Sequence, residues 1–418
     1  MDRIFTGRFY FRGKFDELDV AVSDGKIQRI GKSLTGAPKT KLWKPAIPSG
    51  FDSHVHFREP GESESEDYRT GSMSAVYGGT TTVLDMPNNL IPIRDYERFR
   101  NKLAIASGKS FCDFGLYSLF DGRNLPVIDR DSCGLKIFLG GSTNSLPISD
   151  ESDSLLLLKD YEKPVVFHGE SASCLSRHLL AEVKNLKEHD LSRPEECEME
   201  SANSLAKHSF RSPVMTHISS PKTLDLLPAD FATEATPHHL LLNNGMDLGP
   251  YGKCNPPLRT GQTQEALLQA FLDGRIHAVS SDHAPHPEER KGEFQYASSG
   301  IIGVETRIPL LLGLVAKKIL PLDIMIRTSS SNPAKKFGLK KGMIEEGYYA
   351  DFMTFDLSEI KRINPEKLHS KNSITPFSGF EAVFPSSVIL RGEFALQDGE
   401  IIEDPTGAFT SDLIRENP

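Results

Sequence analysis

Two histidines and an arginine alternate along one short apolar stretch, GFDSHVHFREPG, which covers residues 50–61. One residue separates His54 from His56 and His56 from Arg58, and residues at this spacing in an extended strand point to the same side. Imidazoles that share a face can hold one metal ion, because imidazole nitrogen is a preferred zinc ligand. The stretch therefore predicts a metal site with a guanidinium beside it.

Further side chains that could take part in chemistry stand in or at the ends of other apolar runs. Lys136 lies within GLKIFLG, where a lysine snorkels, pairs with a carboxylate or is modified. His168 and His217 each end a run, and SSDHAPH places Asp282 after another. Four histidines and one aspartate could hold two metal ions, but those ions would need a bridge. A lysine amine that has taken up carbon dioxide would supply an anionic bridge, and a hydroxide between two metals is a nucleophile near neutral pH.

The runs that carry these residues alternate with stretches that suit helices. This pattern predicts an α/β protein with a (β/α)₈ TIM-type barrel, whose chemistry lies at the carboxyl ends of its strands. Both ends of the chain instead indicate short strands with Asp-Gly turns, at 24–25 and 398–399. We therefore expect residues 49–340 to form the barrel, and residues 1–48 with 341–418 to form one small β-sandwich domain. The eight runs are PSGFDSHVHF, GTTTVLDMP, DFGLYSLF, GLKIFLG, PVVFHGE, PVMTHISS, DFATEATPHH and IHAVSSDHAPH.

Composition narrows the class of protein. A net charge of −9 argues against binding to nucleic acid or to anionic membranes. No apolar run approaches the roughly 20 residues that span a bilayer, and the N-terminus lacks the apolar region of a secretory signal. The five scattered cysteines predict reduced thiols in a cytoplasmic protein rather than a disulfide framework. The acidic run ESESED, residues 62–67, is predicted to be a solvated loop or a helix start.

The motifs occur in an order that resembles the dihydroorotases of the amidohydrolase superfamily, over nearly the whole chain. The resemblance implies a zinc-dependent hydrolase of cyclic amides in de novo pyrimidine biosynthesis. Its reaction would be the reversible closure of N-carbamoyl-L-aspartate to L-dihydroorotate, with a hydroxide between two zinc ions as nucleophile. The motifs are DSHVHFREPG, DMPNN, GLKIF followed by STNS, VVFHGE, THISS, KCNPPLR, SSDHAPH and GIIGVET.

The same resemblance implies a role for each metal ligand. His54, His56 and Asp282 would hold the more buried zinc ion, and His168 and His217 would hold the second. Lys136 in its N6-carboxylated form would bridge the two ions. Asp282 would also act as the proton shuttle between the bridging water and the amide nitrogen. Some dihydroorotases have an aspartate as the bridge, and the native metal stays open among zinc, cobalt and manganese.

Arg58, Asn88 and His286 match positions at which the family binds the substrate carboxylate. The chemistry agrees, because both proposed reactants carry a free carboxylate that a guanidinium can clamp with two hydrogen bonds. Asn255 matches a position near the ring, but it also suits a turn before two prolines. Thr143, in the Gly140–Ser145 loop, is either a substrate contact on a closing loop or part of an ordinary turn.

Two other functions stay open, and Arg58 and the metal ligands discriminate between them. The first is an allantoinase- or hydantoinase-type cyclic amidase, whose substrates give no reason for Arg58. The second is a non-catalytic dihydroorotase-like partner subunit, which we would expect to have lost metal ligands. His238 and His239, which end the seventh run, are predicted to be structural. A homodimer would suit the family.

Overall fold

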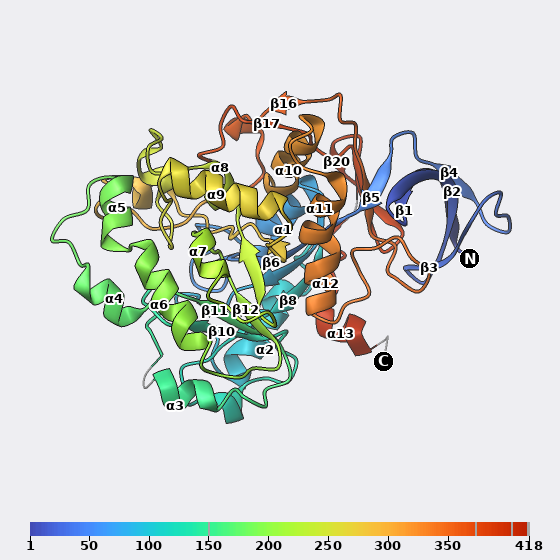
Figure 1. The fold of residues 1–418 in the computed structure, drawn as a ribbon. Coiled ribbons are helices and arrows are strands. Elements are labelled where there is room, and N and C mark those ends of the chain that lie inside the picture. Colours follow the sequence, from blue (N-terminus) through green and yellow to red (C-terminus); the bar gives the residue numbers. More distant parts are fainter. Residues whose placement is uncertain (149–150, 373, 403, 416–418) are drawn as a thin grey trace.

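Parallel strands form the middle of the chain in the computed structural model, which describes residues 1–148, 151–372, 374–402 and 404–415 (Figure 1). One sheet has the order β6-β7-β8, and a second has the order β9-β10-β11-β12-β13-β14, so each strand pairs with its neighbour in sequence. A bridge joins Val55, at the end of β6, to His283, which follows β14. These strands are β6 (Gly50–Val55), β7 (Thr80–Asp85), β8 (Asp113–Leu116), β9 (Ser118–Leu119), β10 (Leu135–Phe138), β11 (Val165–His168), β12 (Pro213–Met215), β13 (Ala232–Ala235) and β14 (Ala278–Val279).

All eight predicted runs contain one or two of these strands. Every residue of β6, β7 and β8 is buried, as are those of β10 to β14. Parallel strands that are covered on both faces appear in sequence as continuous apolar runs, which is why the runs could be recognised. The predicted α/β content of the fold is therefore confirmed.

Helices follow most of the parallel strands. Asp67 and Asp95 begin the first two, because each side chain accepts a hydrogen bond from a backbone N–H three residues later. Helices α5 to α9 lie on the side of the molecule away from the first strands of the chain (Figure 1). The helices are α1 (Tyr68–Tyr77), α2 (Tyr96–Ala106), α3 (Glu151–Leu156), α4 (Ala172–Arg177), α5 (Leu186–Ser192), α6 (Glu195–Leu205), α7 (Pro221–Leu224), α8 (Pro237–Leu241), α9 (Gly261–Leu272), α10 (Arg307–Ala316), α11 (Leu322–Ile326), α12 (Asn332–Lys336) and α13 (Thr410–Arg415).

A separate sheet combines strands from both ends of the chain. Its order is β20-β19-β18-β15-β5-β1-β2-β3, with β4 beside β1. Both predicted Asp-Gly turns are present, because Asp24-Gly25 connects β2 to β3 and Asp398-Gly399 connects β19 to β20. All four turn residues have positive φ angles, as this type of hairpin turn requires. The strands are β1 (Arg3–Phe11), β2 (Lys14–Ser23), β3 (Lys26–Gly31), β4 (Lys39–Lys41), β5 (Ala46–Pro48), β15 (Phe352–Thr354), β18 (Ser387–Leu390), β19 (Glu393–Gln397) and β20 (Glu400–Ile401); β16 (Lys361–Arg362) and β17 (Glu381–Ala382) pair separately.

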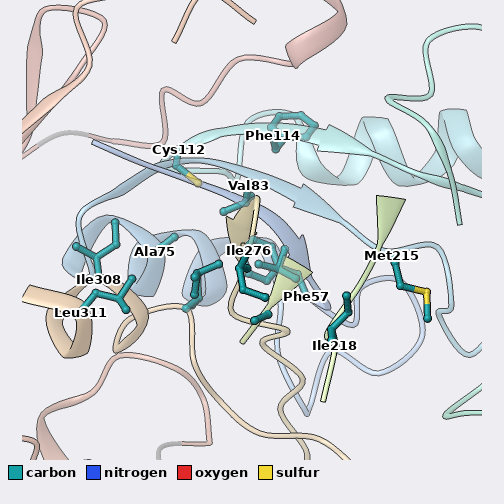
Figure 2. Packing of buried hydrophobic residues seen from close by; sticks show 14 of the residues in the cluster. Phe57, Ala75, Val83, Cys112, Phe114, Met215, Ile218, Ile276, Ile308 and Leu311 are labelled. Atoms are coloured by element: carbon teal, nitrogen blue, oxygen red, sulfur yellow. The ribbon is translucent and has the colours of Figure 1, made fainter. Parts of the chain in front are cut away.

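The apolar core is continuous from the parallel strands to the terminal sheet. Val83 of β7, Ala75 of α1 and Ile308 of α10 belong to one buried cluster, part of which Figure 2 shows. Met353 of β15 and Val388 of β18 belong to the same cluster. The terminal sheet and the parallel strands therefore support each other through shared burial of apolar surface.

Two segments after residue 360 contact the middle part of the chain, one at helix α10 and one at strand β8. Val383 donates a backbone hydrogen bond of 3.0 Å to the carbonyl of Pro309 in α10, next to β17. Phe114 of β8 donates a hydrogen bond of 3.0 Å to the carbonyl of Ala408, just before α13. The residues after β15 therefore contact the middle part of the chain as well as the terminal sheet.

The expectation of reduced cysteines is wrong for one pair. A disulfide joins Cys174 of α4 to Cys197 of α6, whereas Cys112, Cys133 and Cys254 are free. The two bonded cysteines are 23 residues apart and meet only because α4 and α6 pack together. Their spacing carried no sign of this contact, since neither residue belongs to a recognisable cysteine motif.

The prediction of a solvated acidic run at 62–67 is also wrong for two of its acidic residues. Glu62 and Glu66 are buried. Glu62 pairs with Arg290, and Glu66 accepts a hydrogen bond from Ser370. Both partners come from distant parts of the chain, so sequence pattern alone could not reveal them. The alternative of a helix start is right, because Asp67 caps α1.

A helix that could cross a membrane is absent from the part of the chain that the structure describes.

A buried ion cluster at the junction of the two sheets generates a stability prediction. Lys341 Nζ lies 2.7 Å from Asp113 Oδ2 of β8 and also contacts Asp351, next to β15. All three side chains are at most 2% exposed. We expect Lys341→Met to lower the free energy of unfolding by about 3–5 kcal/mol, because it leaves buried carboxylates short of a positive partner. Denaturant titration measures this change.

Lys340→Met is the matched control, because Lys340 is the exposed neighbour of Lys341. It should change the free energy of unfolding by less than about 0.5 kcal/mol. Equal stability of the two variants would show that the buried cluster does not hold the sheets together.

Candidate active site

One cavity contains almost all of the residues that the sequence analysis selected. It lies at the carboxyl ends of the parallel strands, as expected for a barrel-type site. His286 does not line it but stands behind Arg58, with its Nε2 atom 3.1 Å from Arg58 Nη2. The predicted residues that line the cavity are His54, His56, Arg58, Asn88, Lys136, Thr143, His168, His217, Asn255 and Asp282.

Three of them form a compact group of candidate metal ligands. Strand β6 carries His54 and ends just before His56, and Asp282 follows β14. Asp282 Oδ1 lies 3.2 Å from His54 Nε2 and 3.1 Å from His56 Nε2. Two ligands of a tetrahedral zinc ion, each about 2.0–2.1 Å from the metal, stand roughly 3.3 Å apart. The separations in this group therefore fit a shared metal ion.

A second pair of imidazoles faces the first group. His168 ends β11, and His217 follows β12. His168 Nδ1 lies 3.0 Å from His217 Nε2, and the ring centres of His217 and His54 are 5.4 Å apart. Lys136 of β10 lines the same cavity, with Nζ 3.2 Å from Thr216 Oγ1. The donor set thus offers two histidine groups and a lysine beside them.

Burial sets the protonation of these groups. It lowers the pKa of His54, His56 and His217 well below the usual value for histidine. The imidazoles are therefore neutral at physiological pH, which is the form that binds a metal. Burial also lowers the pKa of Lys136 to about 8, although the negative charges of Asp282 and Glu234 oppose that shift. A larger share of Lys136 is thus neutral amine than for an exposed lysine.

Two of the predicted carboxylate-binding residues, Arg58 and Asn88, line the cavity, and His286 stands behind Arg58. Arg58 is only 3% exposed, and its Nε donates a hydrogen bond of 3.1 Å to the carbonyl of Pro285. His286 Nε2 lies between Arg58 Nη2 and the carbonyl of Ser299. Arg58 does not extend β6, because β6 ends at Val55 and Arg58 has a φ of +63°. The predicted common strand face is therefore wrong for Arg58, although its side chain reaches the same cavity from a turn.

Contacts from the cavity walls hold the Gly140–Ser145 loop over the site. Asn88 Nδ2 donates a hydrogen bond of 2.9 Å to the carbonyl of Thr143, and Thr143 Oγ1 donates one of 3.4 Å to the carbonyl of Ser299. Asn144 Nδ2 donates one of 2.7 Å to Glu62. The loop is therefore fastened to the wall that contains Arg58.

Asn255 also faces the cavity, and neighbouring side chains fix its orientation. Its Oδ1 atom lies 3.1 Å from His189 Nε2 and accepts a hydrogen bond of 3.3 Å from Ser299 Oγ. His238 and His239 belong to α8 rather than to the end of β13, because Thr236 caps that helix and Pro237 begins it. His239 lies 2.8 Å from Thr236 Oγ1 and 3.0 Å from the carbonyl of Pro256, which suits a structural role.

Sequence reasoning missed two buried carboxylates behind the histidines. Glu170 Oε2 lies 2.9 Å from His168 Nε2, and Arg193 contacts the same carboxylate. Glu234 of β13 accepts a hydrogen bond from Ser53, and its other oxygen lies 3.9 Å from His54 Nδ1. A signal for Glu234 existed, because it is an ionisable residue in an apolar run, as Lys136 is. Arg193 had no such signal.

Comparisons with known proteins agree with this geometry. The model of the Amidohydrolase family matches residues 46–118 and 152–394. A dihydroorotase of Thermoplasma acidophilum is 51% identical over 98% of both chains, and an allantoinase of Rubrobacter xylanophilus is 32% identical over 98% of this chain and 97% of its own. The solved L-hydantoinase (dihydropyrimidinase) of Arthrobacter aurescens superposes with a TM-score of 0.91 at 26% identity, covering 98% of this chain and 99% of that one.

The fold and the clustered imidazoles define a metal-dependent hydrolase of the amidohydrolase class, and the family match agrees. The chain therefore belongs to the amidohydrolase family, and within it to the dihydroorotases.

The position of Asp282 between two imidazoles generates a prediction about metal binding. We expect Asp282→Asn to weaken the binding of one zinc ion by more than tenfold, because the amide keeps the shape of the side chain but loses its negative charge. Removal of a residue that only hydrogen-bonds to a metal ligand already lowers the affinity for the metal about 10–100-fold. Zinc titration in competition with a chelator measures the change.

Asp273→Asn is the control, because Asp273 is an exposed aspartate at the end of α9. It should bind zinc as the wild type does. Wild-type zinc affinity in Asp282→Asn would remove Asp282 from the ligand set.

Proposed function

We propose that this protein is a dihydroorotase that closes N-carbamoyl-L-aspartate to L-dihydroorotate, reversibly, in pyrimidine biosynthesis. The observation that carries the proposal is the placement of Arg58 in one cavity with both groups of histidines. A substrate with a carboxylate next to a cyclic amide would meet a cation at one end and the metal ligands at the other. The dihydroorotase relatives, at up to 51% identity, support this choice.

The proposed cofactor is a pair of zinc ions. His54, His56 and Asp282 would hold one, His168 and His217 would hold the other, and N6-carboxylated Lys136 would bridge them. The ligand separations near 3 Å and the neutral imidazoles support the assignment. Bound zinc lowers the pKa of a coordinated water and polarises a carbonyl oxygen.

The residues of the chain would then bind the substrate and move the proton. Arg58 and Asn88 would bind the substrate carboxylate with His286 behind Arg58, while Asn255 and Thr143 would contact the ring and exclude water. Asp282 would carry the proton between the water and the ring nitrogen, since its carboxylate faces the cavity between the two imidazoles. In ring closure the same proton would travel in the opposite direction.

The proposed site belongs to a proposed two-domain fold. We propose that the parallel strands close into a (β/α)₈ barrel over residues 49–340, and that residues 1–48 and 341–418 form a small β-sandwich domain. The bridge between Val55 and His283 supports closure, because it connects the first parallel strand to the segment after the last. The sheet that combines β1 to β5 with β15 and β18 to β20 supports the composite domain.

An allantoinase- or hydantoinase-type amidase is the second candidate, since relatives with those names share the fold. Arg58 separates the candidates, because a buried guanidinium with no anionic partner in the substrate would cost stability. A test offers carbamoyl aspartate, dihydroorotate, allantoin and hydantoin to the zinc-loaded enzyme. Turnover of only the first two is expected, and turnover of the uncharged rings alone would contradict the proposal.

Replacement of Arg58 gives a sharper prediction. Arg58→Met should raise KM for dihydroorotate by about 10–100-fold, because the substrate carboxylate loses a charged hydrogen-bond partner in a buried site. Steady-state kinetics measures the change. Arg69→Met, which replaces an exposed arginine of α1, is the control and should leave KM unchanged. An unchanged KM in Arg58→Met would place the carboxylate elsewhere.

The lowered pKa of Lys136 predicts how the bridge forms. Only the neutral amine attacks carbon dioxide: the new N–C bond yields a carbamate, and one proton is released. With a pKa of about 8, the neutral fraction of Lys136 rises about 25-fold between pH 6.5 and pH 8.5. At constant dissolved carbon dioxide, we expect zinc reconstitution of the metal-free protein to be faster at pH 8.5.

Bicarbonate should accelerate this reconstitution in the wild type but not in Lys136→Ala, and native mass spectrometry should detect one added carbon dioxide. Reconstitution that is fast, complete and independent of bicarbonate would contradict the carboxylated bridge.

A further inference from the structure

Behind His168 lies a buried ion pair that the proposed reaction does not use. Glu170 is fully buried, and its Oε2 atom is 2.9 Å from His168 Nε2. Arg193 donates to both carboxylate oxygens, through Nε to Oε1 at 3.1 Å and through Nη2 to Oε2. His168, Glu170 and Arg193 thus form a chain that leads away from the cavity.

Arg193 also contacts the loop over the site. Its Nη2 atom donates a hydrogen bond of 3.0 Å to the carbonyl of Gly141, in the Gly140–Ser145 loop that carries Thr143. One guanidinium therefore contacts both the carboxylate behind a candidate ligand and the loop that covers the cavity.

Covalent and backbone contacts hold the two halves of this ion pair together. Cys174, four residues after Glu170, forms the disulfide with Cys197, four residues after Arg193. Ser171 donates a backbone hydrogen bond of 2.9 Å to the carbonyl of Cys197. The segments that carry Glu170 and Arg193 are therefore fixed relative to each other.

We propose that Glu170 and Arg193 are positioning residues: Glu170 orients His168 toward the second metal ion, and Arg193 couples this ligand to the Gly140–Ser145 loop. The proposal rests on the proposed metal site. It goes beyond that site because neither residue touches substrate or metal.

The orientation follows from the chemistry of imidazole. A neutral ring carries one N–H, and a carboxylate beside Nε2 places the hydrogen there. Nδ1 then keeps its lone pair, and it is Nδ1 that faces His217 at 3.0 Å. Partners of this kind fix the tautomer of a metal-binding histidine and raise its basicity. Arg193 donates to both oxygens of the Glu170 carboxylate and so balances its charge in this buried position.

Zinc affinity tests the role of Glu170 without relying on turnover. We expect Glu170→Ala to weaken the binding of one of two zinc ions by about 10–100-fold. Glu170→Gln should give a smaller loss, because its amide oxygen still accepts the hydrogen bond from His168 but carries no charge. Titration with Zn²⁺ in competition with a chelator resolves the two affinities.

Glu198→Gln is the matched control. Glu198 is as buried as Glu170 and also lies near an arginine, Arg259, but Glu198 contacts no candidate ligand. It should bind both zinc ions as the wild type does. The role of Glu170 would be overturned if both variants bound both zinc ions with wild-type affinity. If Glu170→Ala does not fold, wild-type affinity in Glu170→Gln is sufficient to overturn it. A wild type that binds two zinc ions but converts none of the cyclic amides would refute only the proposed function.

Hydrogen exchange of the loop amides tests the coupling. In the wild type, zinc should slow exchange at residues 141–145 several-fold. Arg193→Lys keeps the charge but cannot reach Glu170 and Gly141 together with the same geometry, so zinc should have little effect on its loop. Arg177→Lys, at an exposed arginine of α4, is the control and should behave as the wild type. An equal effect of zinc on the loop in Arg193→Lys would overturn the coupling.

Discussion

The contact between Asp282 and two imidazoles is the constraint on which the site depends. Asp282 follows the last parallel strand, whereas His54 lies in the first and His56 directly follows it, so the contact exists only if these ends of the strand series meet. The backbone hydrogen bond of 2.8 Å from His56 to the carbonyl of His283 fixes that meeting. Asp282, His217 and Arg58 all have positive φ angles. Such backbone conformations are costly in non-glycine residues and persist where the surrounding structure enforces them, most often at active sites.

Buried polar groups in this protein differ in how completely they are paired. Outside the site, buried charges are paired, as Arg307 is with Asp52 and Lys102 with Asp85. Inside it, and counting only residues that the structure describes, His54 Nδ1 and His217 Nδ1 have no hydrogen-bond partner. Native proteins rarely leave such atoms unsatisfied. Unpaired buried atoms also occur outside the site, for example at both ring nitrogens of His238, so these two atoms alone do not mark the site.

The sequence revealed site residues where an ionisable side chain lies in or at the end of a buried strand. Lys136 and Asp282 were recognisable because ionisable residues interrupt or end apolar runs, and the runs themselves reflect burial on both faces of parallel strands. The disulfide of Cys174 and the ion pair of Arg193 were not recognisable. They arise where α4, α6 and the residues that precede these helices pack together, and the sequence pattern of one segment does not record its contact with another. Glu62 was misjudged for the same reason, because its partner Arg290 lies in another loop.

A strand carries the residue at one end of the cavity, and a turn carries the residue at the other. His54 is held in a buried strand, but Arg58 reaches the cavity from a turn after that strand has ended. A turn can change its length or residues with less effect on the core than a strand can. The proposed carboxylate clamp can therefore change while the candidate metal ligands stay in place. This separation gives a physical reason why relatives named dihydroorotase, allantoinase and hydantoinase can share one fold.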